Sequence, residues 1–130
     1  SMMPRSPSKP PAKRRLAAEK QGHHGEALAG VFLQAKFYRL REKRFKTPVG
    51  EIDLIAEKSG TIVFIEVKTR SKNADEAMAL GAVNRSRIIR AAQYWLSRHP
   101  AESGKDMRFD VIFLAPGRWP RHLINAFPAV

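Results

Sequence analysis

Apolar and polar residues alternate along two neighbouring stretches in the middle of the chain. In "TIVFIEVKT" (61–69), every second residue from Val63 to Val67 is aliphatic, and the side chains of a strand point alternately to its two faces. The preceding stretch "EIDLIAE" (51–57) alternates in the same way, and its apolar face comprises Ile52, Leu54 and Ala56. The pattern predicts an antiparallel hairpin around the polar, glycine-containing segment 58–60.

Helical periodicity marks the segments before and after this hairpin. The segment 25–36 carries a stripe of Leu28, Phe32 and Ala35 with Val31 beside it, and its Ala29 and Gly30 are small enough for close packing. A second helix is predicted over 83–98, with an apolar stripe of Ile88, Ala91, Ala92, Trp95 and Leu96. We expect further strands at 37–46 and 107–115, a mobile loop at 71–82, and an edge strand or docked tail at 122–127.

The order of these elements is helix, three strands, helix and strand. This order predicts an α/β fold in which helices flank a mixed central β-sheet. The chain has 130 residues, which suits one domain. Four of the nine prolines fall in residues 1–24, together with six basic residues and one acidic residue. We therefore expect a flexible basic tail at 1–24 and a folded domain at 25–130.

The charge of the chain narrows the classes of partner. Its 24 Lys and Arg against 12 Asp and Glu give a formal net charge of +12, which favours nucleic acid as a partner. No apolar run approaches the roughly 18 residues of a membrane span, and no apolar segment of a secretory signal follows the basic N-terminus. The chain has no cysteine, which fits a reducing compartment. We expect a cytoplasmic protein that does not bind membranes.

Charged residues interrupt both strands of the hairpin near the same end. Glu51 and Asp53 lie on the first strand, and Glu66 and Lys68 lie on the second. A four-residue loop, 58–61, places Asp53 opposite Glu66, and a two-residue loop makes them diagonal neighbours on one face. A three-residue loop, 58–60, puts them on opposite faces unless a bulge intervenes.

Two readings of these side chains follow from the spacing. If Asp53 and Glu66 meet, their repulsion favours a divalent cation, and Mg²⁺ binds through one or two carboxylates, water and phosphate. Lys68 on the same face would then stabilise charge that develops on a phosphate, as phosphodiester hydrolysis requires. The alternative is cross-strand Glu–Lys pairing on a solvated face, which stabilises by at most about 1 kcal/mol.

The central segment "GEIDLIAEKSGTIVFIEVKTR" closely resembles the signature of the bacterial YraN family of endonuclease-like proteins. The segments "GHHGEALAGVFL", "AAQYWL", "RFDVIFL" and "INAF" follow in the same order, so the resemblance covers about residues 22–127. It implies a core like that of the PD-(D/E)XK nucleases, and of the archaeal Holliday-junction resolvases. It further implies Mg²⁺- or Mn²⁺-dependent cleavage of DNA, including branched or recombination DNA, and a homodimer.

The resemblance also assigns roles to individual residues. Asp53 and Glu66 would be metal ligands with the Val67 carbonyl as a third, Lys68 the catalytic lysine, and Glu26 the outer carboxylate. Glu51 would assist these residues. Asp110 in "RFD" would have a structural role, or it would contact the metal ligands without binding the metal itself. The chain departs from the family at Asn84, where a lysine is usual; Arg85 or Arg87 would then contact phosphate instead.

A basic rim is the last feature that we expect of the site. On their own, the basic residues near the hairpin and the second helix are equally well explained as solvated surface; together they favour a rim that binds DNA. Its members are Arg70, Lys72, Arg85, Arg87 and Arg90. Trp95 and Phe109 are expected in the core. The rival to an enzyme is a nucleic-acid-binding module on the same fold that no longer cleaves.

Overall fold

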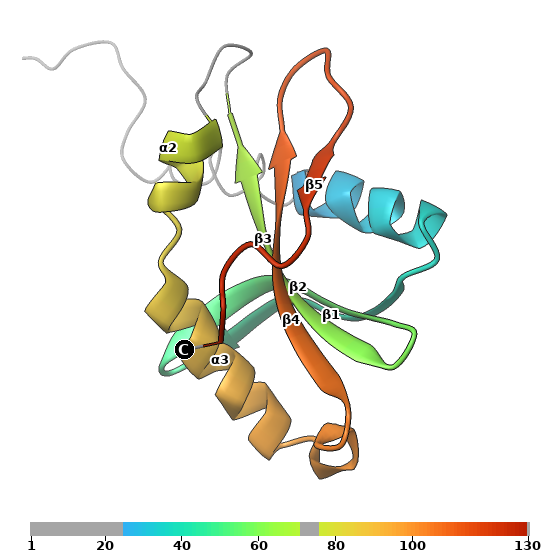
Figure 1. The fold of residues 1–130 in the computed structure, drawn as a ribbon, viewed down its shortest axis with the longest axis vertical. Coiled ribbons are helices and arrows are strands. Elements are labelled where there is room, and N and C mark those ends of the chain that lie inside the picture. Colours follow the sequence, from blue (N-terminus) through green and yellow to red (C-terminus); the bar gives the residue numbers. More distant parts are fainter. Residues whose placement is uncertain (1–24, 71–75, 130) are drawn as a thin grey trace, which may run out of the picture.

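The computed structural model describes residues 25–70 and 76–129 (Figure 1). The predicted tail at 1–24, part of the predicted loop and Lys72 lie outside these ranges. A first helix spans 25–35. It is followed by β1 (Arg39–Thr47), β2 (Gly50–Lys58), β3 (Thr61–Thr69), α2 (Glu76–Gly81), α3 (Arg85–Ser97), the 3₁₀ turn η1 (Pro100–Glu102), β4 (Asp106–Leu114) and β5 (Arg121–Leu123).

The five strands form one mixed sheet in the order β1-β2-β3-β4-β5. β3 and β4 run parallel, and the other neighbouring pairs are antiparallel. The first helix and α3 lie on different sides of this sheet (Figure 1). The sequence-based prediction of an α/β fold with a mixed sheet between helices is therefore confirmed.

Each face of the sheet carries its own hydrophobic core. On the face covered by α3, Trp95 packs with Phe64, Phe109 and further residues of β3 and β4. On the opposite face, Ala29 and Leu33 of the first helix pack with aliphatic residues of the same strands. Trp95 and Phe109 are almost completely buried, as expected. Because both faces of β3 are covered, the alternating side chains of Ile62–Ile65 enter two cores, whereas the charged end of the strand is partly exposed.

The hairpin between β2 and β3 has the register that brings the two carboxylates together. Leu54 pairs with Ile65 and Lys58 with Thr61, and the same register places Asp53 level with Glu66. The turn consists of Ser59 and Gly60, both with positive φ (52° and 78°), as in the turns that match the twist of two-residue hairpins. The predicted four-residue loop for this register is wrong, because Lys58 and Thr61 already belong to the strands.

The apolar face predicted for β2 is also wrong at one residue. Leu54 and Ala56 contact the first-helix core, but Ile52 joins the core under α3. The strand therefore loses its regular alternation around Asp53. The neighbouring strand β1 is also irregular: its register to β2 shifts between Leu40 and Glu42, and Arg44 adopts a left-handed conformation with φ of 53°.

Two predictions for the flanking segments need correction. The first helix buries Ala29 and Leu33, whereas the predicted stripe residue Leu28 is 49% exposed and Val31 is 63% exposed. The small residues decide this packing, because a side chain at Gly30 would already approach the Leu40 side chain to 3.2 Å. The second half of the predicted loop at 71–82 instead forms the short helix α2.

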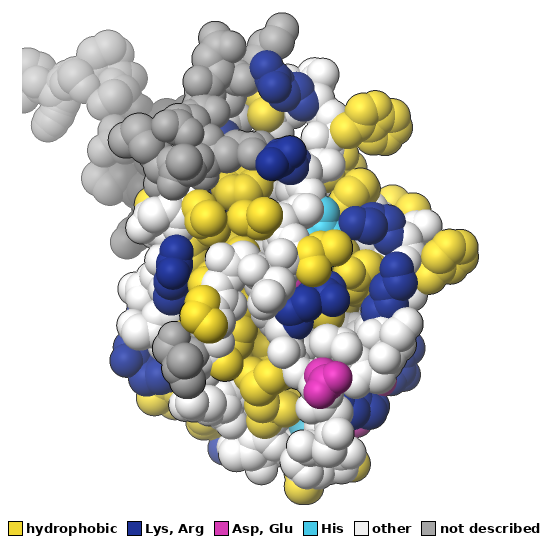
Figure 2. Space-filling view, viewed as in Figure 1, with side chains coloured by type: hydrophobic (Ala, Val, Ile, Leu, Met, Phe, Trp, Pro, Cys, Tyr) yellow, Lys and Arg dark blue, Asp and Glu magenta, His cyan; other side chains and the backbone are white. Residues whose placement is uncertain are grey.

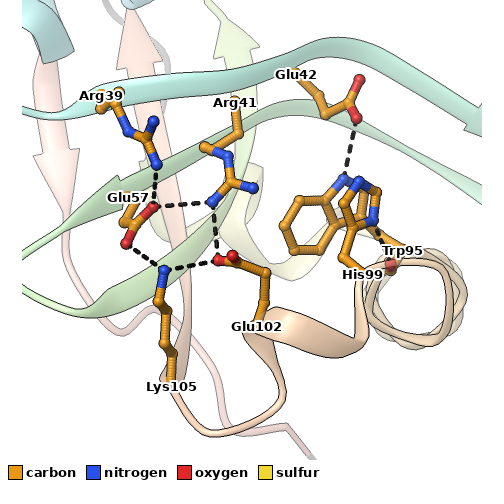
Figure 3. Close-up of polar contacts among 8 residues, drawn as sticks. All are labelled: Arg39, Arg41, Glu42, Glu57, Trp95, His99, Glu102 and Lys105. Carbon is orange, nitrogen blue, oxygen red and sulfur yellow. Dashed lines mark hydrogen bonds and ion pairs between the residues drawn. The ribbon is translucent and has the colours of Figure 1, made fainter.

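A charged network closes the turn end of the hairpin (Figure 3). Arg39, Arg41 and Lys105 all donate to Glu57 at 2.7–2.8 Å, and Arg41 and Lys105 also donate to Glu102. Hydrogen bonds led by that from Lys105 hold the pKa of Glu57 down at about 2. The network joins β1 and β2 to η1 and the residues before β4. Glu57 and Glu102 are therefore paired with basic side chains that join these elements.

Candidate active site

Asp53 and Glu66 meet at the opposite end of the hairpin. Asp53 accepts a 2.7 Å hydrogen bond through Oδ2 from the backbone N–H of Val67, the residue that follows Glu66 on β3. In a strand, the N–H and C=O of one residue point to the same neighbouring strand. The Val67 carbonyl therefore lies on the Asp53 side of β3, so the three predicted ligands are grouped.

Glu66 is held in an environment that disfavours its charge. Its side chain is 18% exposed. Burial, followed by the hydrogen bond and negative charge of Asp53, raises the pKa of Glu66 to about 8. Lys68 lies 3.3 Å away, from Nζ to Glu66 Oε2, and opposes this rise. A carboxyl that keeps its proton near neutral pH needs a further positive charge to ionise fully.

Glu26 reaches the same carboxylates from the first turn of the first helix. Its side chain is 13% exposed and lies 3.5 Å from Arg44, measured from Oε2 to Nε. Burial and then the charge of Asp53 raise the pKa of Glu26 to about 7, against the opposing influence of Arg44. Asp53 thus stands between two carboxyls from two other elements.

Two small pockets flank this cluster, and Glu51 lines both. One has a volume of about 40 Å³ and is lined by Glu26, Arg44, Lys46, Glu51, Ile52 and Asp53. The other has a volume of about 80 Å³ and is lined by Glu51, Glu66, Asn84, Arg87 and Ile88. Arg44 was not among the site residues predicted from the sequence. Its signal was weak, since it is one of several basic residues on β1.

The predicted basic residues are brought to the site unequally. Arg87 lines the larger pocket beside Glu66. Arg70 follows the end of β3 and donates to the Thr69 carbonyl at 3.1 Å, whereas Arg85 packs over the Phe127 ring at 5.4 Å. Arg90 is exposed on α3, and Lys72 lies outside the described residues. On the face in Figure 2, Lys and Arg side chains far outnumber Asp and Glu.

The wall of the larger pocket is set by a backbone contact. A Cβ at Gly50 would lie 2.1 Å from the carbonyl oxygen of Arg87, so only glycine lets β2 approach the start of α3 this closely. Asn84 caps α3 by accepting a 3.3 Å hydrogen bond from the Arg87 N–H. Asn84 therefore positions the start of this helix.

Asp110 lies away from the carboxylate cluster, on the first-helix side of the sheet. Its side chain is fully buried and accepts hydrogen bonds from Arg108, His122 and the Asn125 N–H at 2.7–2.9 Å. Burial acts to raise the pKa of Asp110, but these hydrogen bonds together hold it below its ordinary value. These contacts favour the structural role that we expected for Asp110.

The oxygen atoms of Asp53, Glu66 and the Val67 carbonyl are of the type that binds a hard divalent cation. The separation of the acidic side chains fits such an ion less well. Carboxylates and a carbonyl are the oxygen ligands that Mg²⁺ takes, and Mg²⁺ needs only one or two carboxylates besides water and phosphate. Within 25–70 and 76–129, however, no three Asp, Glu or His side chains form a group that could hold a metal. The fit therefore rests on the Asp53–Glu66 pair, with Glu26 farther out.

Comparisons with known proteins identify relatives along nearly the whole chain. The profile of the family described as "Uncharacterised protein family UPF0102" matches residues 25–114. A UPF0102 protein of Bradyrhizobium sp. strain BTAi1 is 50% identical over 123 residues, covering 95% of this chain and 90% of its own. UPF0102 proteins of Rhodopseudomonas palustris strain BisA53 and Methylorubrum extorquens strain PA1 are each 47% identical, covering 95% of both chains. These names assign no activity. None of the described helices is long and apolar enough to cross a membrane.

Proposed function

The chain belongs to the UPF0102 family, and we propose that it is a metal-dependent endonuclease that hydrolyses phosphodiester bonds of DNA. One observation carries the proposal: the carboxyls of Glu26 and Glu66, from two other elements, flank Asp53, and burial followed by the influence of Asp53 raises their pKa values to about 7 and about 8. Neighbouring carboxyls beside a lysine suit the binding of a cation. The formal net charge of +12 suits the binding of a polyanion.

The roles follow from the contacts. Asp53 and Glu66 would hold Mg²⁺ or Mn²⁺ with the Val67 carbonyl, and the ion would activate water and neutralise phosphate charge. The hydrogen bond from the Val67 N–H orients Asp53. Lys68 is paired with Glu66, and its ammonium group would contact a phosphate oxygen if Glu66 held the ion. Glu26 would hold a water of the metal's outer shell, with Arg44 balancing its charge.

We also propose a fold type, a partner, a cellular location and an oligomeric state. A mixed sheet that carries its acidic ligands on a hairpin supports a core of the PD-(D/E)XK type, with DNA, including branched DNA, as the partner. Arg87 beside Glu66 supports a phosphate contact next to the reacting group. A cytoplasmic location and a homodimer belong to the same proposal.

The spacing of the carboxyls favours a second candidate. Since no three acidic side chains among the described residues form a ready metal group, a module that binds nucleic acid without cutting it agrees equally well with the basic surface. Cleavage separates the two candidates. Linear, flapped and four-way DNA are incubated with Mg²⁺ or Mn²⁺ and wild-type protein, Asp53→Asn, Glu66→Gln or Lys68→Met.

The matched control is Asp106→Asn. Asp106 is exposed at the start of β4 and pairs with Thr61 at the far end of the sheet, and its substitution removes the same single charge as Asp53→Asn. An endonuclease loses at least about 100-fold of its cleavage rate in Asp53→Asn and none in Asp106→Asn. Equal cleavage by both variants would disprove the catalytic site, and tight binding without cleavage by wild type would establish the module.

A further inference from the structure

The loop between β4 and β5 exposes a tryptophan. Trp119 is 89% exposed, although large aromatic side chains usually gain stability by burial. Trp95, the other tryptophan of the chain, is completely buried. The packing of the domain therefore explains Trp95, whereas Trp119 makes no comparable contribution to a core.

The backbone holds Trp119 in a defined place. The N–H of Arg118 donates to the Ala115 carbonyl at 3.2 Å, and the turn between them contains Pro116 and Gly117, whose φ is 71°. Proline followed by a glycine of positive φ is the sequence of a type II turn. Pro120 restricts the chain on the other side of Trp119. Because the backbone on both sides of Trp119 is restricted, less conformational freedom of the chain is lost when the ring binds a ligand.

The strand register places this loop beside the candidate active site. Lys68 pairs with Phe113 across β3 and β4, and Phe113 pairs with Arg121 across β4 and β5. Register partners point to the same face of a sheet, so Arg121 leaves the sheet on the side of Lys68. Trp119 precedes Arg121 by two residues. With a spacing of about 4.8 Å between neighbouring strands and about 3.3 Å between successive residues, Trp119 lies roughly 10–15 Å from Lys68.

The charges around the loop select the kind of ligand. Arg118 and Arg121 flank Trp119 in sequence and are both exposed, and residues 111–130 include no Asp or Glu. Aromatic rings set in a positively charged groove bind single-stranded nucleic acid, because every base offers a face for stacking. An acidic protein partner would match the charge alone, and it would leave the rigid presentation of a single ring unexplained.

We propose that Trp119 stacks on an unpaired base of a nucleic-acid strand that runs through the candidate active site. This inference rests on the proposed function for the nature of the ligand, and it narrows the substrate class. A distance of 10–15 Å corresponds to roughly three or four stacked nucleotides at 3.4 Å each. Strands that leave a duplex near the cleaved bond, as in flaps, overhangs and branches, are thus preferred over uninterrupted duplex.

Binding measured without cleavage tests this inference. Wild-type protein, Trp119→Ala, Trp119→Phe and Phe37→Ala are titrated in EDTA, at one salt concentration, into labelled oligothymidylate and a blunt duplex of the same length. Phe37→Ala is the matched control, because Phe37 is 86% exposed and follows the first helix on the other side of the sheet. Fluorescence anisotropy gives the affinities, and tryptophan emission reports contact with the ring.

The expected result separates the two ligands. Trp119→Ala weakens binding of oligothymidylate by about 5- to 100-fold and changes duplex binding by less than about twofold. Trp119→Phe keeps most of the affinity but loses the quenching that oligothymidylate causes in wild type, and Phe37→Ala behaves like wild type. Unchanged single-strand affinity in Trp119→Ala overturns the inference, and so does an equal loss on both ligands. A change of oligomeric state in Trp119→Ala, seen by light scattering, would also overturn it in favour of a protein interface.

The outcome is independent of catalysis. If no metal supports cleavage, the titrations in EDTA still decide whether Trp119 binds unpaired bases, and only the proposed function fails. If Trp119→Ala binds like wild type while cleavage still depends on Asp53, the nuclease proposal survives and the stacking role is rejected.

Discussion

The backbone N–H of Val67 donates a 2.7 Å hydrogen bond to the Asp53 carboxylate across the β2–β3 hairpin. This bond lies one residue beyond the last regular pair, Leu54 with Ile65. A side chain thereby takes the place of the next ladder contact between the strands. Asp53 serves the structure and the candidate site together, and substitutions at this position can separate the two contributions.

Asp53→Asn and Asp53→Ala should differ in stability. Asparagine retains an oxygen that can accept from the Val67 N–H and removes the charge that opposes Glu26 and Glu66, so we expect a free energy of unfolding equal to or above that of wild type. Alanine leaves the partly buried N–H unpaired, which costs about 1–3 kcal/mol. Urea denaturation in EDTA measures both values. An asparagine variant less stable than the alanine variant would show that the bond contributes nothing.

The stability of the metal-free protein should fall as the pH rises toward 8. The pKa of Glu66 is about 8 in the folded protein, against 4.5 for a free carboxyl, so between these values the folded state binds a proton that the unfolded state releases. The free energy of unfolding therefore decreases across this window, and Glu26 acts in the same direction. Glu66→Gln should remove part of the slope and gain on the order of 2 kcal/mol above pH 8.

Chemical denaturation at several pH values in EDTA checks the slope, and Mn²⁺ provides the control. A bound dication favours the ionised carboxyls, so it should stabilise wild type more at high pH than at low pH. It should have little effect on Glu66→Gln at either pH. A wild-type slope that Glu66→Gln leaves unchanged would contradict the raised pKa.

Gly50→Ala should disturb the start of α3. The added Cβ meets the Arg87 carbonyl oxygen at 2.1 Å, and two backbones cannot separate as easily as a side chain can turn. We expect a loss of about 1–3 kcal/mol, typical of overpacking. Thermal and urea denaturation measure it. Gly104→Ala is the control, since a Cβ there meets nothing within 4 Å; equal losses in both variants would refute the role of this contact.

Asp110→Asn should damage stability and leave the chemistry of the site intact. Removing the charge from a fully buried carboxylate that pairs with Arg108 and His122 costs about 3–5 kcal/mol. The pKa of Asp110 lies below its ordinary 3.8, so its contribution is present above that pH and is lost as the pH falls through the folded value. Between pH 2 and 6, the free energy of unfolding of Asp110→Asn should therefore depend less on pH than that of wild type. The free energy of unfolding of Asp106→Asn should depend on pH as in wild type. Denaturation at several pH values measures both.

The sequence predicted best those elements that a single packing surface determines. The stripe of α3 from Ile88 to Trp95 was correct because a helix on one sheet face buries every third or fourth residue. The first helix was assigned the wrong face because close approach to the sheet favours Ala29 over the larger Leu28. Local hydrophobicity does not reveal how near two backbones will come.

The candidate site divides in the same way. Asp53, Glu66 and Lys68 could be placed from strand alternation, since they interrupt an otherwise apolar hairpin. The contribution of Arg44 could not, because Arg44 is one of several basic residues on β1 and its partner Glu26 lies on a helix outside the local sequence pattern of that strand. The register could be narrowed to three possibilities, but the choice among them depended on two adjacent positive φ values at Ser59 and Gly60.

β5 has only three residues, and the side chains of its adjacent residues point to opposite faces of the sheet. Arg121 leaves the sheet on the side of Lys68, whereas His122 lies on the other side and binds Asp110 at 2.7 Å and Lys36 at 2.7 Å. Three pairs to β4 alone would fray readily, so His122 acts as an anchor for the end of the loop that carries Trp119. The position of the exposed Trp119 ring thus depends on the buried Asp110 carboxylate on the opposite face of the sheet. A defect in that anchor would displace the ring without altering any residue of the loop that carries it.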